Sequence, residues 1–125
     1  MTQGQTLAKL LDERLDDYVD TAVKWVARAE GFEQDELIRQ AHRGFAMVIR
    51  GAVDGDMRPR DRYIDSAVRG LHDQGLGIDA LMRGMVQTAS LVTAWATENG
   101  AAESIPWLIE FFGDYTVRLA QVYAE

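Results

Sequence analysis

Two histidines are the residues of this chain best suited to binding a metal or a haem iron. His42 lies beside the apolar stripe of residues 38–45, and His72 follows Leu71 near the end of the next predicted helix. Histidine is the usual axial ligand of haem. A metal site of helices instead needs several His or carboxylate side chains one turn apart. Neither histidine has such a neighbour, so we expect each to lie on its helix at the boundary between the apolar and the solvated face, with one side apolar and the other wet.

Carboxylates and hydroxyls give no clearer indication of catalysis. Asp12, Glu13, Asp16 and Asp17 fall on adjacent turns without a histidine nearby, which favours a solvated helix face over a cation site. A nucleophilic serine would need a base and a third orienting group, and Ser104 is expected to N-cap the last helix instead. We predict that the protein is not an enzyme and has no catalytic residues, metal site or cofactor. A helical enzyme is the least favoured alternative.

Composition restricts the classes of partner. The chain has 125 residues, no cysteine and a formal net charge of -7, which argues against nucleic acid because phosphate neutralisation needs clustered Lys and Arg. The N-terminus lacks the features of a signal peptide. The longest stretch without charge, residues 84–97, is too short and too polar to span a bilayer. We therefore expect a cytoplasmic protein that binds neither nucleic acid nor membrane.

Apolar residues recur at the spacing of amphipathic helices along the whole chain. Glycine-containing breaks divide it into five predicted helices, over residues 6–30, 35–53, 59–74, 78–98 and 104–124. Both prolines, Pro59 and Pro106, stand where a helix would begin, the position at which proline is tolerated best. The pattern predicts a single all-α domain over residues 1–125, either a five-helix bundle or a globin-like stack.

One segment has a recognisable sequence character, a two-glycine break followed at once by a strongly amphipathic helix. It reads Gln74, Gly75, Leu76, Gly77, Ile78, Asp79, Ala80, Leu81, Met82, Arg83. This segment resembles the region before the penultimate long helix of RsbR-type (RsbT co-antagonist) N-terminal domains. Helix order and total length are also similar. The chain departs from that family at Leu71, where an arginine is usual, and at Gly77, where Ser, Thr or Pro is usual.

The resemblance implies a helical input module of bacterial stress regulation. Such a domain would be a globin-like or bundle-like dimer that binds no haem and transmits a signal through helix packing. RsbR-type domains are typically fused to an output module. Since the chain ends at Glu125, we expect either a free-standing partner of other regulators or a fragment of a longer one.

Four glycines inside predicted helices indicate either close helix approach or space for a ligand. Gly44 and Gly51 are one heptad apart, and Gly84 and Gly113 lie in the last two helices. Each costs nearly 1 kcal/mol relative to alanine. Close packing against a neighbouring helix is the favoured compensation.

The last helix carries more apolar surface than one core stripe needs. Trp107 and Phe111 lie one turn apart on a second face and Tyr123 on another, and Trp25 could complete a shared surface. Aromatic residues of this kind are enriched in protein interfaces. These residues are candidates for a homodimer interface or for docking a regulatory protein. The alternative is that the last helix is central and buried on all sides.

The preferred interpretation is therefore a non-enzymatic signalling, sensory or protein-interaction domain that acts through helix packing and dimerisation. The main alternative is a sensor that binds a small molecule between the second and fourth predicted helices. Phe45, Met82 and Met85 would line that pocket. Methionines at helical spacing also serve as ordinary core residues.

Overall fold

The structure is an all-α domain, as the sequence predicts. The computed structural model describes residues 2–30 and 35–124, with side chains for all of these except residues 26–30. Its helices are α1 (Gln3–Glu13), α2 (Leu15–Glu30), α3 (Asp35–Asp54), α4 (Arg58–Asp73), α5 (Ile78–Glu98) and α6 (Ile105–Ala124), with a 3₁₀ turn, η1 (Ala102–Ser104). The described residues contain no strand.

The first predicted helix is wrong in one respect, because it is two helices. Arg14 ends α1 with φ -127° and ψ 35°, and its backbone N–H donates to the carbonyl of Leu10. Its guanidinium bonds Asn99 and pairs with Asp17, which fixes the bend. The sequence conceals this break because arginine is a good helix former and the apolar stripe continues from Leu11 across the bend.

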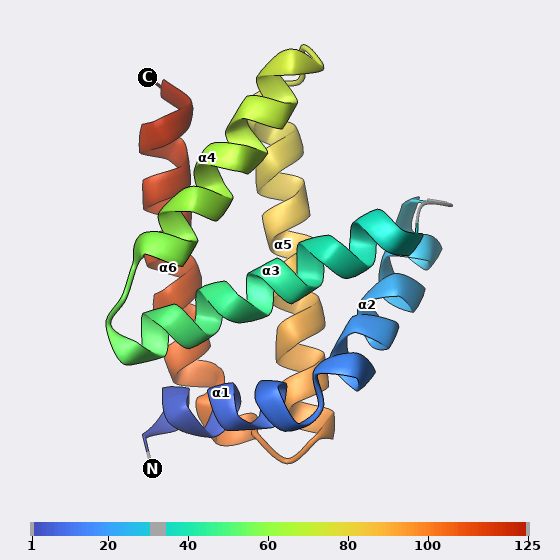
Figure 1. Cartoon of the computed structure of the whole chain (residues 1–125), viewed down its shortest axis with the longest axis vertical. Coiled ribbons are helices and arrows are strands. Elements are labelled where there is room, and N and C mark those ends of the chain that lie inside the picture. The colour runs from blue at the N-terminus through green and yellow to red at the C-terminus, as the bar shows by residue number, and fades with distance from the viewer. Residues whose placement is uncertain (1, 31–34, 125) are drawn as a thin grey trace.

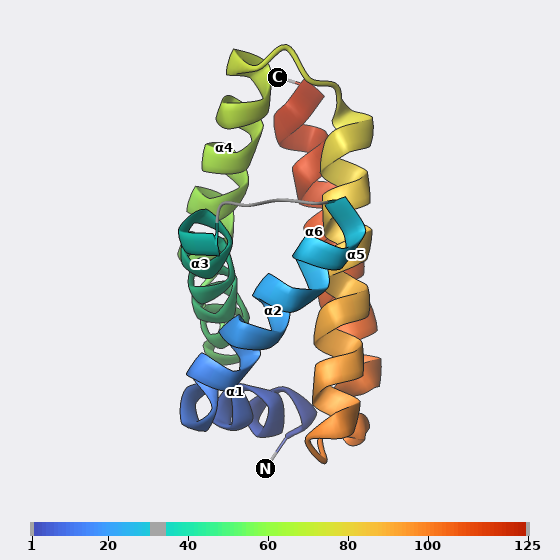
Figure 2. The same ribbon diagram turned by 90° about the vertical axis from the view of Figure 1, so that its right-hand side faces the viewer.

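The bend allows α1 and α2 to pack against different parts of the domain. Figure 1 shows α4, α5 and α6 running along the long axis while α3 crosses them, and α1 lies across the end where α5 turns into α6. Figure 2 shows α2 climbing diagonally away from α1, with α5 and α6 together on one side of the molecule. The contacts agree, since α1 packs against α3, η1 and α6, whereas α2 packs against α3 and α5.

The glycine break before α5 has the geometry expected of a helix C-terminus. Gly75 has φ +70°, a conformation that favours glycine. The N–H of Leu76 donates to the carbonyl of Leu71 over 2.9 Å, and the Tyr123 hydroxyl donates to the carbonyl of Leu76 over 2.9 Å. The break thus joins the start of α5 to the end of α6.

Ser104 has a different role from the predicted helix cap. Its side chain is fully buried, and its hydroxyl donates to the backbone carbonyl of Gln3 over 2.7 Å. The bond fixes the beginning of α1 against η1. A backbone acceptor 101 residues away is invisible to reasoning from local sequence.

The helical glycines divide into two kinds, and close approach explains only some of them. A Cβ at Gly51 would lie 2.7 Å from the carbonyl oxygen of Asp56, and one at Gly44 would meet the Tyr63 ring at 3.4 Å. At Gly84 and Gly113 a Cβ would meet no atom within 4 Å. The expected close packing is therefore wrong for Gly84 and Gly113.

Alanine substitutions should distinguish the two kinds of glycine. Gly51→Ala is expected to lower the free energy of unfolding by about 1–3 kcal/mol, because the backbone carbonyl of Asp56 cannot move aside easily. Gly113→Ala, with open space around its Cβ, should raise it by about 1 kcal/mol through helix propensity. Urea denaturation followed by circular dichroism measures both, and equal effects at the two positions would contradict the packing at Gly51.

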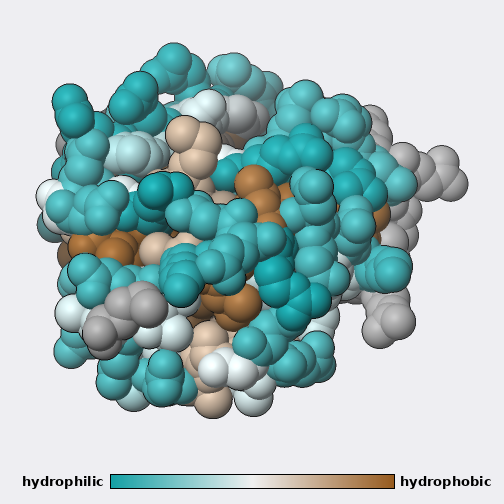
Figure 3. Space-filling view, turned by 60° about the horizontal axis from the view of Figure 1, so that its bottom comes forward, coloured by the Kyte–Doolittle hydropathy of each residue, from teal (hydrophilic) through white to brown (hydrophobic). Residues whose placement is uncertain are grey.

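The surface is mainly hydrophilic where α1 faces the viewer. Figure 3 shows teal side chains covering most of this face, with hydrophobic ones in separate brown groups. Within residues 2–30 and 35–124, no helix is long and apolar enough to cross a membrane.

Candidate ligand-binding pocket

A pocket of about 360 Å³ lies between α3, α4, α5 and α6. Its size falls within the range of small-molecule sites. Most of its lining is apolar, and the polar members are His42, Tyr63, Gln87, Thr88 and Tyr115. Among the lining residues that the structure describes there is no Lys, Arg, Asp or Glu. The pocket is thus suited to a molecule that is mainly apolar and uncharged.

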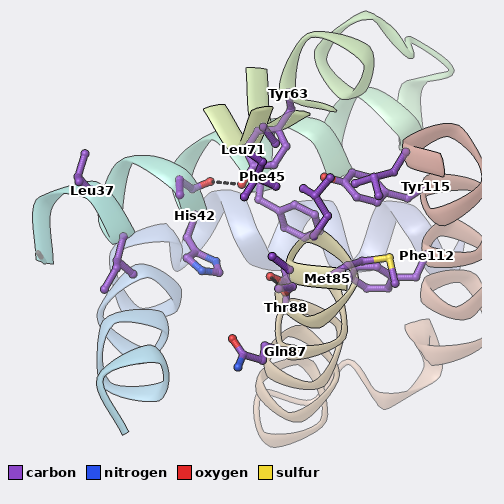
Figure 4. A pocket seen from close by; sticks show the side chains of 17 residues that line it. Leu37, His42, Phe45, Tyr63, Leu71, Met85, Gln87, Thr88, Phe112 and Tyr115 are labelled. Atoms are coloured by element: carbon purple, nitrogen blue, oxygen red, sulfur yellow. Dashed lines mark hydrogen bonds between the residues drawn. The ribbon is translucent and has the colours of Figure 1, made fainter. Parts of the chain in front are cut away.

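Two of the three residues proposed for a pocket from the sequence lie in its lining. Phe45 on α3 and Met85 on α5 face each other across it, as Figure 4 shows. Met82 is packed against the core but does not line the pocket. The reason is helical phase: Leu81, Gly84 and Met85 share the inner side of α5, and Met82 is rotated by about 100° from Leu81.

Gly84 belongs to the pocket rather than to a helix contact. It is among the lining residues, and a Cβ there would project into open space. Space for a ligand, the less favoured interpretation of this glycine from sequence, is therefore the one that its surroundings match.

Phe45 anchors the pocket wall in a cluster of aromatic rings. Its ring centroid lies 5.8 Å from that of Phe112, 6.0 Å from Phe111, 6.1 Å from Tyr63 and 6.2 Å from Tyr115. Three of the four pairs are edge-to-face, an arrangement that aromatic rings favour. The cluster joins α3, α4 and α6, so it makes the wall rigid.

His42 is buried against the pocket, contrary to the expectation of a boundary residue. It is 8% exposed, and its Nδ1 lies 2.9 Å from the hydroxyl of Tyr18 on α2. Burial lowers the pKa of His42 from 6.5 to about 4, because desolvation disfavours the charged imidazolium. The imidazole is therefore neutral at pH 7.

Tyr18 is held in place by its neighbours. Its ring is fully buried and meets Trp95 edge-on at 5.3 Å between centroids. The Trp95 indole N–H donates to a carboxylate oxygen of Asp17 over 3.0 Å. Burial raises the pKa of Tyr18 well above its ordinary value, so the phenol keeps its proton.

The other tyrosines of the site also remain protonated. Desolvation raises the pKa of Tyr63 and of Tyr115. The Tyr63 hydroxyl donates to the backbone carbonyl of Ala41 over 3.3 Å. Sequence reasoning missed Tyr18 and Tyr115 as polar members of the site and placed them only in apolar stripes. The available signal was the hydroxyl itself, since a buried tyrosine hydroxyl usually finds a partner.

The structure corrects the interface proposed for Trp107 and Phe111. Phe111 is only 7% exposed and stacks on Trp107 with centroids 5.4 Å apart. The Trp107 indole covers Gly4 on α1, where a Cβ would come within 2.9 Å of it. Because α1 crosses the end of α6, this second aromatic face packs within the monomer.

Trp25 and Tyr123, the other interface candidates, are also engaged. Both are partly buried and packed against the core. The Tyr123 ring meets His72 edge-on at 4.7 Å, and its hydroxyl bonds to the α4–α5 turn. His72 is exposed, as expected of a boundary histidine.

The acidic residues of α1 and α2 form a solvated, ion-paired face. Asp12 pairs with Arg50 at 2.6 Å and Glu13 with Lys9 at 3.8 Å, all with exposed side chains. Among the residues that the structure describes, no three His, Cys, Asp or Glu side chains group so as to hold a metal ion.

The fold and the site together define an all-α helical bundle with a partly open pocket between four helices, whose described lining is uncharged. Comparison with family models, curated proteins and solved structures found no match to this chain. A functional conclusion thus depends on the geometry of the pocket.

Proposed function

We propose that this protein is a non-enzymatic sensory domain that binds a small, mainly apolar molecule between α3, α4, α5 and α6. The main evidence is the pocket of about 360 Å³, whose lining within residues 2–25 and 35–124 carries no charged side chain. A concave apolar site with a few convergent polar groups is the usual form of a small-molecule site.

A ligand bound in this pocket would alter the packing of the helices around it. Its walls come from four helices, and Figure 4 shows Phe45, Met85, Phe112 and Tyr115 converging from three of them. A ligand that fits one arrangement of these helices better than another shifts the population toward it. We propose that a regulatory protein partner responds to this shift, as the resemblance to RsbR-type input domains implies.

The experiment compares phenylalanine at two open helical glycines. Gly84→Phe places a ring in the pocket lining, whereas Gly113→Phe adds the same ring outside it, and neither Cβ meets an atom within 4 Å. With acetophenone as probe in ¹⁵N-heteronuclear NMR titration, Gly84→Phe should weaken binding at least tenfold. Gly113→Phe should leave it unchanged. Absence of saturable binding to the wild type would overturn the proposal.

Homodimerisation is a second candidate function, and an exposed apolar surface on α5 and α6 favours it. Ile109 and Val117 on α6 are 69% and 57% exposed, and Val86 on α5 is 57% exposed. The two helices are joined by a 2.7 Å hydrogen bond from the Thr116 hydroxyl to the Met85 sulfur. Val86 and Val117 each follow one of the two bonded residues, so at about 100° per residue both side chains are turned away from this junction.

The part of this surface on α5 lacks charge, because residues 84–97 contain no Asp, Glu, Lys or Arg. On α6, the exposed Glu110 and Asp114 stand seven and three residues before Val117 and share its side of the helix. A second copy of this acidic chain would therefore make its apolar contacts mainly through α5, where like charges do not oppose each other. The surface replaces the aromatic residues Trp107 and Phe111 as the candidate dimer interface.

Two aspartates should abolish such a dimer. Ile109→Asp with Val117→Asp is expected to give a monomer with unchanged helicity in light scattering and circular dichroism, since both side chains are exposed. Gln40→Asp with Ser66→Asp, two exposed positions on α3 and α4, serves as control. A wild type that is monomeric at high concentration would contradict dimerisation.

A further inference from the structure

Two buried polar side chains of the pocket have unused hydrogen-bonding capacity. His42 is 8% exposed and Tyr115 is 5% exposed, and both line the pocket. Among the described residues, no hydrogen bond reaches Nε2 of His42 or the hydroxyl of Tyr115. Figure 4 shows the two side chains extending from α3 and α6 into the space between the helices. Neither atom is sealed from solvent, since Nε of Arg118 is the one buried, unpaired side-chain atom among the described residues. Both groups are therefore accessible and can bond an occupant of the pocket.

The bond to Tyr18 determines which nitrogen of His42 carries the proton. The Tyr18 hydroxyl is buried, retains its hydrogen, and has Nδ1 of His42 as its partner at 2.9 Å. A buried hydroxyl hydrogen needs an acceptor, and a neutral imidazole offers one accepting and one donating nitrogen. Tyr18 therefore donates to Nδ1, which assigns the proton to Nε2. His42 presents an N–H donor to the pocket.

The remainder of the lining disfavours a charged occupant. Its described residues include no Lys, Arg, Asp or Glu, and an ion taken from water without a compensating charge is strongly destabilised. The apolar walls around Phe45, Met85 and Phe112 suit a hydrocarbon or aromatic body. The volume of about 360 Å³ equals roughly a dozen waters at about 30 Å³ each, which suits a small ligand.

We propose that the pocket selects a neutral, largely apolar molecule with a carbonyl-type acceptor, which accepts a hydrogen bond from Nε2–H of His42, with the Tyr115 hydroxyl as a second donor. Tyr18 acts as a positioning residue, because it orients the imidazole and fixes its tautomer. The inference rests on the proposed ligand-binding function and adds the class of ligand.

Three probes of similar shape separate acceptor recognition from simple apolar binding. Acetophenone carries a carbonyl, α-methylstyrene replaces that oxygen with a methylene group, and benzoate adds a negative charge. Dissociation constants come from ¹⁵N-heteronuclear NMR titration of the full chain at pH 7. We expect acetophenone and α-methylstyrene to bind, and benzoate to bind at least tenfold more weakly than acetophenone.

The decisive variants each remove one donor from the pocket. His42→Leu withdraws the pocket-facing N–H, and Tyr18→Phe is made with it so that no buried hydroxyl loses its partner. In this double variant, acetophenone affinity should fall about tenfold while that of α-methylstyrene changes less than twofold. Tyr115→Phe should weaken acetophenone alone by about threefold. Two-bond ¹⁵N–¹H spectra of the wild type should show the Nε2–H tautomer of His42, with the Nε2 signal shifting on addition of acetophenone.

The outcomes distinguish the two proposals. If no probe binds the wild type, the ligand-binding function itself fails. If acetophenone and α-methylstyrene both bind but lose affinity equally in the variant with His42→Leu and Tyr18→Phe, the pocket remains and acceptor recognition by His42 is overturned. An Nδ1–H tautomer in the wild type would also overturn it, and that measurement needs no variant to fold.

Discussion

Replacing Phe45 with alanine is expected to lower the free energy of unfolding by about 3–5 kcal/mol. Phe45 is 3% exposed and contacts four aromatic rings from α4 and α6 at centroid distances of 5.8 to 6.2 Å. Its removal takes away the transfer free energy of the ring and leaves unfilled volume beside an existing pocket. Chemical denaturation at pH 7, followed by far-ultraviolet circular dichroism, measures the loss.

Leu37→Ala provides the matched control for Phe45→Ala. Leu37 is on the same helix and also lines the pocket, but its side chain is 58% exposed. It should therefore change stability by no more than about 0.5 kcal/mol. If both substitutions have similarly small effects, the aromatic cluster does not hold α3 against α4 and α6.

Acid should destabilise the protein through His42 before the carboxylates contribute. The pKa of His42 is about 4 in the folded protein against 6.5 in the unfolded chain, so the unfolded state binds more protons between these values. The stability due to the neutral imidazole is complete above pH 6.5 and is lost as pH falls toward 4. The total loss is about 3 kcal/mol, at about 1.36 kcal/mol for each unit of pKa difference.

Urea denaturation at intervals from pH 7 to pH 4 measures this loss. The pKa of Asp56 is lowered to about 2 by its hydrogen bonds to Arg58, so the stability that Asp56 contributes disappears below pH 4 and not in the same window. His72→Asn removes the other histidine, and a transition that this variant shares with the wild type belongs to His42. Stability that stays constant between pH 6.5 and 4.5 would contradict a neutral, buried His42.

The helices could be predicted because their information is local. The spacing of apolar residues predicts α3, α4, α5 and α6 to within a few residues, and Gly75 marks the turn before α5. Arg14 could not be identified as a helix end, because its side chain bonds Asn99, 85 residues away. The identity of a residue does not reveal a hydrogen-bond partner that lies so far away in the sequence.

The pocket could be anticipated only in part. The order of the helices was enough to place Phe45 and Met85 near each other. Met82 was wrongly predicted to line the pocket, because the sequence does not show how α5 is rotated about its axis. His42 and Tyr18 come from stripes of two helices, and their 2.9 Å contact depends on how α2 crosses α3. No sequence spacing predicts that crossing.

The sequence alone therefore determined the class of this protein: an all-α, acidic domain of amphipathic helices separated by glycine turns, because helical periodicity and turn chemistry act over only a few residues. The tertiary structure decided which apolar faces are buried. It buried Phe111, packed Trp107 against Gly4 of α1, left Ile109 outside, and set a neutral His42 beside a pocket. Burial and the pairing of polar groups depend on surroundings contributed by distant parts of the chain, and these exist only once the helices have packed.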